Sequence, residues 1–169
     1  MNEPLALFTV TRSRQPGRLS TMARPRGREQ LAADMAALRG SGADILVCAL
    51  PDSERAELGL ADEPRLARAA GLQFVSLPIP DLTVPPMSVV LPVLRSLTES
   101  LRAGAHVVAH CRCGIGRSSL IAVALLILDG TTPEVAWASM ERARGARVPD
   151  TVEQREWTLE LFRLVASGG

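Results

Sequence analysis

The sequence contains no lysine and no tyrosine, and all 19 of its Lys-or-Arg positions are arginine. Without lysine, the chain cannot carry the nucleotide-binding motif in which a lysine follows a glycine-rich turn. The formal net charge is +1, so the overall charge does not point to a nucleic-acid or anionic-membrane partner. Residues 12–28 are rich in arginine but have no interleaved aromatic residues, which favours a solvated loop over a nucleic-acid surface.

Cysteine is also scarce. The three thiols, Cys48, Cys111 and Cys113, are too few and too unevenly spaced for a disulfide framework, so we expect a reducing compartment, the cytoplasm. The longest apolar run, Leu120–Leu128, is far shorter than the ~20 residues that cross a bilayer. Residues 1–10 lack the basic head and long apolar centre of a signal peptide, so neither a secretory signal nor a membrane partner is expected.

Strand-like and helix-like patterns alternate along the chain. Strands are expected at residues 5–10, 44–49, 72–77 and 105–109. Helices are expected at residues 29–38, 52–70, 87–101, 117–128 and 132–144, and from 150 onward with Asp150 and Glu153 as a capping box. Residues 11–28 and the proline-rich stretch 78–86, here called the proline loop, are expected to be irregular. The alternation predicts an α/β fold: a single domain over residues 1–169, with a central, mostly parallel sheet of four to five strands and helices on both faces.

Residues 110–119 read HCRCGIGRSS and join an expected buried strand to an expected buried helix. In open α/β sheets, catalytic groups gather at such strand ends. Residues 111–116, here called the cysteine loop, have a length that suits a turn around a tetrahedral anion. Gly114 and Gly116 permit the backbone angles that turn successive N–H groups inward, and such amides at a helix N-terminus attract an oxyanion. The guanidinium of Arg117 can clamp two oxygens of the same anion.

A site that holds an anion also favours the ionised form of Cys111. A thiol at a helix N-terminus can have its pKa lowered from about 8.5 to ~3.5–7.5. The thiolate is then a nucleophile at neutral pH. Because the loop would hold a phosphate with its phosphorus against the sulfur, the sequence predicts a reactive thiol aligned for attack on a bound ester.

The stretch HCRCGIGRS, together with PIPD at 78–81 and the small size, resembles the cysteine-dependent protein tyrosine phosphatases, and among them the compact bacterial members of the dual-specificity branch. The resemblance implies that Cys111 is the nucleophile of a phosphocysteine intermediate and that Arg117 clamps the phosphate. It also implies that Ser118 donates a hydrogen bond that helps the thiolate leave. The other phosphate-binding positions would be Arg112, Cys113, Gly114, Ile115 and Gly116, and no metal or other cofactor is expected. Arginine in place of lysine likewise favours a bacterial source.

Asp81 lies 30 positions before Cys111, between the prolines of the proline loop. In the phosphatases that the chain resembles, an aspartate at about this spacing protonates the leaving oxygen and later accepts a proton from water. The resemblance thus makes Asp81 the general acid and base, a contribution of ~10²–10⁴-fold. The alternative is a loop aspartate that bonds its own backbone. The residues after Asp81, LTVP, are one longer than the family's Gly-Val-Pro.

Three further residues are candidates for supporting roles. His110 is expected to brace the cysteine loop rather than carry a proton. Gln154 resembles the glutamine that positions the hydrolytic water in parts of the family, and the alternative is a solvated helix residue. Cys48 is either a small buried hydrophobe or, as in some relatives, the partner of a protective disulfide with Cys111. Cys113 is the rival partner, although a bridge across two residues would be strained.

The same loop indicates the substrate class. Phosphoinositide phosphatases of this superfamily tend to carry lysines in the loop, and this chain has none, although Arg112 offers one charge. With no tyrosine, the deep aromatic slot of the large phosphotyrosine enzymes cannot be built the same way. We expect a shallower pocket for phosphotyrosine in proteins or peptides, with phosphoserine and phosphothreonine as further candidates and with phosphate, sulfate or vanadate as inhibitors. The alternatives are a phosphoinositide phosphatase and a rhodanese-type sulfurtransferase, whose loops usually hold one residue fewer.

Overall fold

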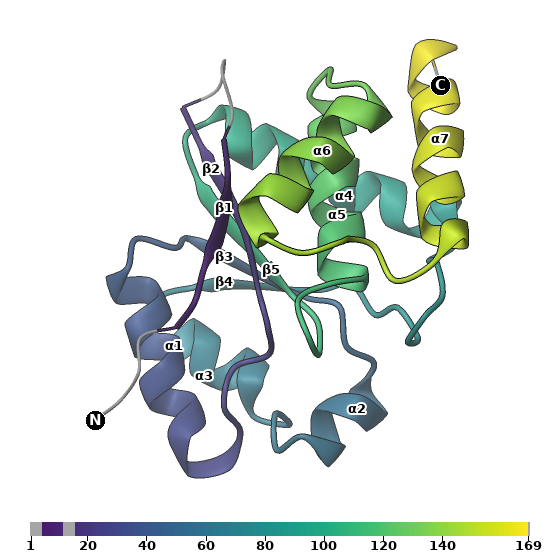
Figure 1. The fold of residues 1–169 in the computed structure, drawn as a ribbon. Coiled ribbons are helices and arrows are strands. Elements are labelled where there is room, and N and C mark those ends of the chain that lie inside the picture. Colours follow the sequence, from purple (N-terminus) through teal and green to yellow (C-terminus); the bar gives the residue numbers. More distant parts are fainter. Residues whose placement is uncertain (1–4, 12–15, 169) are drawn as a thin grey trace.

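A five-stranded sheet forms the centre of the computed structural model, which describes residues 5–11 and 16–168 (Figure 1). In spatial order the strands are β1 (Phe8–Val10), β2 (Arg18–Met22), β5 (His106–His110), β3 (Ile45–Cys48) and β4 (Gln73–Ser76). β1 pairs antiparallel with β2, and all the other neighbouring strands pair in parallel. The expected mostly parallel sheet is therefore confirmed, with five strands.

Helices cover both faces of the sheet, as expected (Figure 1). On one face lie α1 (Leu31–Gly40) and α3 (Glu63–Ala69), with α2 (Asp52–Glu57) near the end of the sheet, after a 3-10 turn at Arg28–Gln30. On the other face lie α4 (Met87–Arg102), α5 (Arg117–Leu128), α6 (Pro133–Arg144) and α7 (Val152–Ala166). Each face has its own apolar cluster, because the strand side chains alternate between the two faces.

Helix α5 is buried on nearly every side, and this explains why it lies between the sheet and the other helices of its face. Eleven of its twelve residues are buried, so each side of the helix needs a protein surface. Strands β2 and β5 supply one such surface, and helices α4, α6 and α7 supply the others. Because α5 is enclosed in this way, its first residue, Arg117, has a fixed position at the end of the sheet.

Strand β2 corrects the expectation that residues 11–28 are irregular throughout. The segment RLSTM shows no polar–apolar alternation because the sheet is covered on both faces, and its last four residues are all buried. Ser20 is buried without an unsatisfied hydroxyl, since its Oγ lies 2.7 Å from His106 Nε2. Of the arginines in this stretch, Arg12 and Arg14 lie outside the described residues.

The last helix begins one residue later than expected. Thr151, not Asp150, is its N-cap: Thr151 Oγ1 accepts the backbone N–H of Gln154 at 3.1 Å. Gln154 Oε1 accepts the N–H of Thr151 at 3.2 Å and completes the capping box. The sequence DTVEQ contains two overlapping capping patterns, and the structure uses Thr151 with Gln154. The Asp150 side chain is thereby released from capping.

The carboxyl end of β5 is where the segments around the cysteine loop converge. His110, its last residue, is opposite Met22 of β2 and Cys48 of β3. The cysteine loop follows directly, so the chain segments that leave β2 and β3 flank it. This is the end of the sheet at which the sequence predicts catalytic groups.

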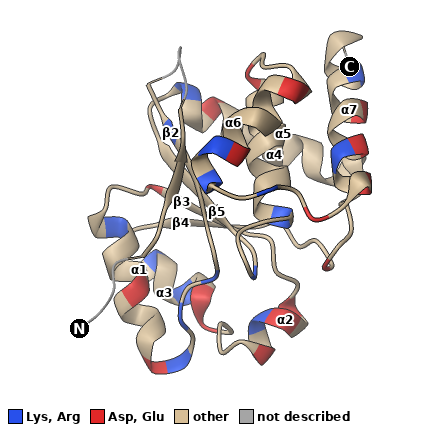
Figure 2. Ribbon diagram, in the orientation of Figure 1, with Lys and Arg blue, Asp and Glu red and all other residues tan. Residues whose placement is uncertain are grey.

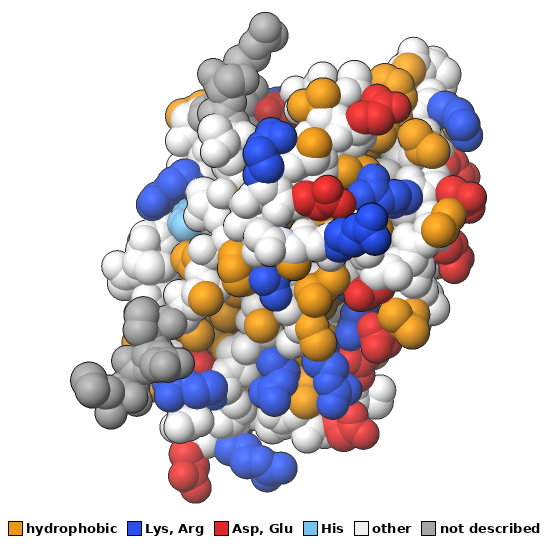
Figure 3. Space-filling view, viewed as in Figure 1, with side chains coloured by type: hydrophobic (Ala, Val, Ile, Leu, Met, Phe, Trp, Pro, Cys, Tyr) orange, Lys and Arg blue, Asp and Glu red, His pale blue; other side chains and the backbone are white. Residues whose placement is uncertain are grey.

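Apart from Arg18 at the start of β2, the charged residues of the described ranges lie on helices and connections, and the ribbons of β3, β4 and β5 carry none (Figure 2). On the face of the molecule shown in Figure 3, acidic and basic side chains are interspersed, in keeping with the net charge of +1. Within the two described ranges, no helix has both the length and the hydropathy needed to cross a bilayer.

Candidate active site

The cysteine loop wraps around the sulfur of Cys111, which is only 3% exposed. The backbone N–H of Gly114 donates to Cys111 Sγ at 3.3 Å. The Ser118 hydroxyl, in the first turn of α5, lies 3.2 Å from the same sulfur and is hydrogen bonded to it. Gly114 N–H donates to the sulfur, and the Ser118 hydroxyl, which accepts from the thiol, can donate once the thiol has lost its proton, so both groups stabilise the negative form.

The outer side of the loop is fixed through its carbonyl groups. The backbone N–H of Arg24 donates to the Arg112 carbonyl at 3.3 Å. Arg144, at the end of α6, donates from Nε to the Gly114 carbonyl at 3.0 Å and from Nη2 toward the Cys113 carbonyl at 3.5 Å. Because the C=O and N–H of a planar peptide point in opposite directions, outward carbonyls leave the amides free to face the inside of the loop. This arrangement suits an oxyanion.

The two loop glycines are required for different reasons. Gly114 has φ +71°, and a Cβ there would lie 2.9 Å from the backbone nitrogen of Ala23, so both conformation and space demand glycine. Gly116 has an ordinary φ of −90°, which corrects the expectation that it needs unusual backbone angles. It is restricted by space instead, because a Cβ there would lie 2.0 Å from Asp150 Oδ2.

The loop lowers the pKa of Cys111 despite burial. Burial alone would raise the pKa of this thiol. Hydrogen bonds from the Ser118 hydroxyl and from the backbone N–H groups of Ser118 and Gly114 lower the pKa, and the positive charge of Arg117 lowers it further. Together these interactions more than offset the effect of burial. The net direction of the pKa shift is downward, as the sequence predicts, so Cys111 ionises more readily than an ordinary thiol.

Arg117 is buried at the mouth of the loop and is held by two groups that the sequence did not indicate. Its Nη1 and Nη2 donate to Glu54 Oε1 and Oε2 at 2.7 and 3.1 Å, a two-pronged pair. Nη1 also donates to the Ile79 carbonyl at 2.9 Å. The guanidinium side chain is 2% exposed and the Glu54 side chain 16%. Glu54 lies on α2 in a polar stretch whose sequence carries no sign of this role.

The proline loop brings Asp81 to the same arginine. Asp81 Oδ1 lies 3.3 Å from Arg117 Nη2, and the Asp81 side chain is 57% exposed. Oδ1 also accepts the N–H of Leu82, the local bond that the alternative interpretation proposed, so this bond does not keep Asp81 away from Arg117. Helix α7 ties down the far end of the loop, where Trp157 Nε1 donates to the Pro85 carbonyl at 2.9 Å. A thiol, an arginine and an exposed carboxylate thus converge at one strand end.

A family model described as "Polymorphic toxin system, DSP-PTPase phosphatase" matches residues 20–131, more than half of the chain and including the cysteine loop. The chain belongs to this phosphatase family. Membership supports the dual-specificity-like resemblance and disfavours the sulfurtransferase alternative. The curated relative "Cyclin-dependent kinase inhibitor 3" of Rattus norvegicus is 30% identical over 86 residues. That match covers 50% of this chain and only 41% of the relative's own length.

Two solved structures show that the chain shares its fold with known proteins. Kinase-associated phosphatase, with serine in place of its catalytic-site cysteine, aligns with a TM-score of 0.85 and 22% identity, covering 99% of both chains. PTPMT1 in complex with PI(5)P aligns with a TM-score of 0.74 and 16% identity, covering 89% of this chain and 93% of its own. Both structures support the dual-specificity phosphatase-like architecture.

His110 lies behind the loop in a fully buried polar cluster. Its Nδ1 lies 3.1 Å from the Cys111 carbonyl, and its Nε2 is hydrogen bonded to Glu63 Oε1 of α3. Burial would lower the pKa of His110, but the charge of Glu63 and the hydrogen bond to Cys48 raise it well above its ordinary value. His110 is therefore placed to brace the loop, as the sequence analysis expects. Cys48, Glu63 and His110 also form the one group of three possible metal ligands found within the described ranges.

Gln154 is fully buried, so the alternative interpretation as a solvated residue is wrong. Its Oε1 accepts the N–H groups of Asp150 and Thr151, and its Nε2 donates to the Thr83 carbonyl of the proline loop at 3.4 Å. Its Nε2 also lies 3.3 Å from the position that a Cβ of Gly116 would occupy. Gln154 therefore connects α7, the proline loop and the cysteine loop.

The remaining loop side chains point to the surroundings rather than to the sulfur. Arg112 is exposed, and its Nη1 lies 4.0 Å from Glu57 of α2. Cys113 is exposed, whereas Cys48 and Cys111 are buried, and all three are free thiols. Ile115 is partly buried and packs against the core. Arg112 is thus the loop side chain that can add positive charge at the rim.

Proposed function

We propose that the chain hydrolyses phosphate monoesters of proteins, foremost phosphotyrosine, through a phosphocysteine intermediate. The proposal depends chiefly on one observation: Cys111, with its lowered pKa, lies inside a loop whose next helix begins with the buried Arg117. The family to which the chain belongs consists of phosphatases and supports the same reaction.

In the first step the Cys111 thiolate attacks phosphorus. The P–S bond forms as the ester P–O bond breaks, while Arg117 and the loop amides hold the equatorial oxygens. Asp81, 3.3 Å from Arg117 and open to solvent, gives a proton to the leaving oxygen.

In the second step water attacks the phosphocysteine, and Cys111 leaves as a thiolate. Ser118 stabilises that thiolate, since its hydroxyl lies 3.2 Å from the sulfur. A carboxylate must accept the proton of the attacking water, and the family resemblance gives this task to Asp81 as well. The reaction needs no metal ion or other cofactor.

The substrate proposal rests on the composition of the chain and on the charge beside the loop. The chain has no tyrosine to build a deep aromatic slot, so phosphoserine and phosphothreonine remain candidates beside phosphotyrosine. Phosphoinositides form the second candidate class, because the exposed Arg112 can meet an additional phosphate, and PTPMT1, of similar fold, was solved with PI(5)P. Phosphate, sulfate and vanadate should inhibit by occupying the loop. A cytoplasmic location, a bacterial source and the absence of nucleic-acid or membrane partners stay predictions from composition.

Turnover of p-nitrophenyl phosphate in buffer with EDTA tests the reaction. The wild type should turn over, Cys111→Ser should not, and Asp81→Asn should lose about 10²–10⁴-fold with a poor leaving group such as phenyl phosphate. Unchanged turnover by Cys111→Ser would reject the phosphatase assignment. Phosphopeptides carrying phosphotyrosine, phosphoserine or phosphothreonine, and a soluble phosphoinositide, then rank the substrate classes by kcat/KM.

A further inference from the structure

Asp150 lies against the cysteine loop, in a position that its expected capping role did not indicate. The contact with Gly116 is so close that a Cβ there would lie 2.0 Å from Asp150 Oδ2 and 2.9 Å from its Cγ. The main chain is fixed at this point, because the Asp150 N–H donates to Gln154 Oε1 at 3.1 Å. The carboxylate therefore rests beside the residue that precedes Arg117.

Hydrolysis of a phosphocysteine needs a group that accepts a proton from water, and most acceptors at the site are occupied. Gln154 Oε1 already accepts two backbone N–H groups. Asp81 Oδ1 accepts the N–H of Leu82 and lies 3.3 Å from Arg117. In residues 5–11 and 16–168, no protein donor is hydrogen bonded to the Asp150 carboxylate. Among the described residues, both oxygens of Asp150 are thus open to a water molecule, whereas at Asp81 Oδ1 is engaged and Oδ2 is open.

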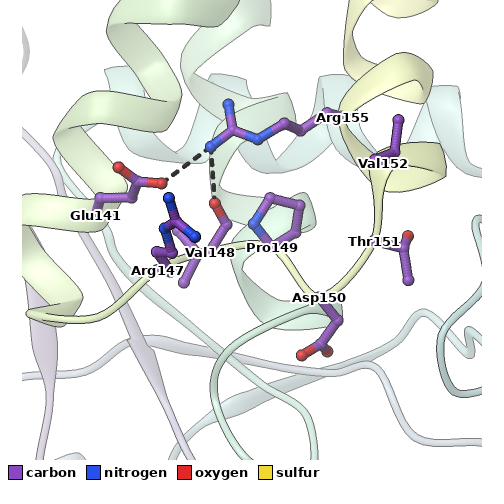
Figure 4. A pocket seen from close by; sticks show the side chains of 8 residues that line it. All are labelled: Glu141, Arg147, Val148, Pro149, Asp150, Thr151, Val152 and Arg155. Carbon is purple, nitrogen blue, oxygen red and sulfur yellow. Dashed lines mark hydrogen bonds and ion pairs between the residues drawn. The ribbon is translucent and has the colours of Figure 1, made fainter.

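The surroundings of Asp150 raise the pKa of its carboxyl, so it is a stronger base than a solvated aspartate. Neighbouring protein atoms that displace water raise its pKa, the negative charge of Asp81 raises it further, and Arg117 opposes them. Figure 4 shows the Asp150 carboxylate directed away from Arg147 and Arg155. Arg155 is engaged with Glu141 Oε1 and the Val148 carbonyl, each at 2.9 Å. Among the described residues, neither Arg147 nor Arg155 forms an ion pair with Asp150.

We infer that Asp150 is the general base of the second step, an inference that rests on the proposed function. A water oxygen attacks the phosphorus of the phosphocysteine, the O–P bond forms as the S–P bond breaks, and sulfur leaves as the Cys111 thiolate. The proton of the water passes to Asp150 Oδ2, inorganic phosphate departs, and the exposed carboxyl returns the proton to solvent. Gln154 donates its second Nε2 hydrogen to the water oxygen. Asp81 acts as the acid of the first step and not, as the family resemblance implies, also as the base of the second.

The test uses p-nitrophenyl phosphate, whose good leaving group needs little acid assistance, in rapid-mixing experiments. Asp150→Asn should release a burst of one p-nitrophenolate per active site, followed by turnover at least about 100-fold slower than wild type. Intact-protein mass spectrometry after rapid denaturation should find most of the variant phosphorylated on Cys111. Glu153→Gln, an exposed acid on the first turn of α7, is the matched control and should behave as wild type in both measurements. Thermal unfolding checks that both variants are folded.

Asp81→Asn separates the two carboxylates. With p-nitrophenyl phosphate it should accumulate no phosphocysteine, whereas with phenyl phosphate its first step should slow. The inference is overturned if Asp150→Asn turns over like wild type, if it slows without accumulating phosphocysteine, or if Asp81→Asn accumulates the intermediate instead. In each of those cases the proposed function stands, provided that Cys111→Ser is inactive. An active Cys111→Ser protein would remove the proposed function itself.

Discussion

Replacement of Glu54 by glutamine should destabilise the protein through the buried Arg117. The two carboxylate oxygens of Glu54 lie 2.7 and 3.1 Å from the guanidinium nitrogens, and the arginine side chain is 2% exposed. Breaking a buried ion pair by removing one partner costs about 3–5 kcal/mol, because the other charge is left uncompensated. Glutamine keeps one acceptor oxygen and Asp81 remains 3.3 Å away, so we expect the lower end, about 3 kcal/mol.

Inorganic phosphate should reverse much of this loss. A dianion in the cysteine loop supplies Arg117 with the negative charge that Glu54→Gln removes. At a phosphate concentration 100 times its own dissociation constant, either protein is stabilised by about 2.7 kcal/mol, so the difference between them narrows only by as much as the variant binds phosphate more tightly. Because the competing carboxylate is gone, phosphate should bind the variant more tightly than wild type. The difference in the free energy of unfolding between the two proteins should therefore shrink as phosphate is added.

Urea unfolding with and without phosphate measures both quantities. Glu57→Gln, on the same helix, is the control: its side chain is 71% exposed and its oxygen lies 4.0 Å from Arg112, so its loss should stay below about 1 kcal/mol. A loss below about 1 kcal/mol for Glu54→Gln would refute the reasoning about an uncompensated buried charge. If Glu54→Gln lowers the free energy of unfolding as much at saturating phosphate as without phosphate, the claim that a bound anion can replace the charge of Glu54 beside Arg117 is refuted.

Three further predictions concern the loop itself. Ser118→Ala removes a hydroxyl that stabilises the thiolate, so the pKa of Cys111 should rise, and the midpoint of iodoacetamide alkylation against pH should move upward; an unmoved midpoint counts against it. Gly114→Ala forces a side chain into φ +71° and 2.9 Å from the Ala23 nitrogen, and should lower the free energy of unfolding in urea by about 1–3 kcal/mol; a neutral result would show that the loop can shift. If Cys48 protects Cys111 as a disulfide, Cys48→Ser should recover less activity than wild type after peroxide and reductant, and full recovery would end that interpretation.

The parts of the site that are local in sequence could be predicted from it. Cys111, Gly114, Arg117 and Ser118 lie within eight consecutive positions, and their spacing alone indicates a loop at a helix N-terminus. The alternation of strands and helices was likewise sufficient for a mostly parallel sheet with helices on both faces. Asp81 needed the family resemblance, because a lone aspartate between prolines has a purely local explanation as well.

The missing parts depend on packing between distant segments. Glu54 lies 63 positions from Arg117, and no pattern in the polar stretch around it marks one acid as buried. Asp150 reaches Gly116 only because Thr151 takes over the capping role, a choice between two overlapping motifs that sequence could not make. Strand β2 was not predicted, because a strand that is buried on both faces lacks the polar–apolar alternation by which half-buried strands are recognised.

Arg144 links the edge of the sheet to the chemistry at its centre. Its guanidinium carbon lies 4.2 Å from the ring centre of Phe8 in β1, while its nitrogens hold the carbonyls of Cys113 and Gly114. A bulky fusion or a competing strand that separates β1 from β2 would move Arg144 away from the loop carbonyls. The peptides of the cysteine loop could then rotate. The conformation of the cysteine loop would then depend on the integrity of a strand at the edge of the sheet.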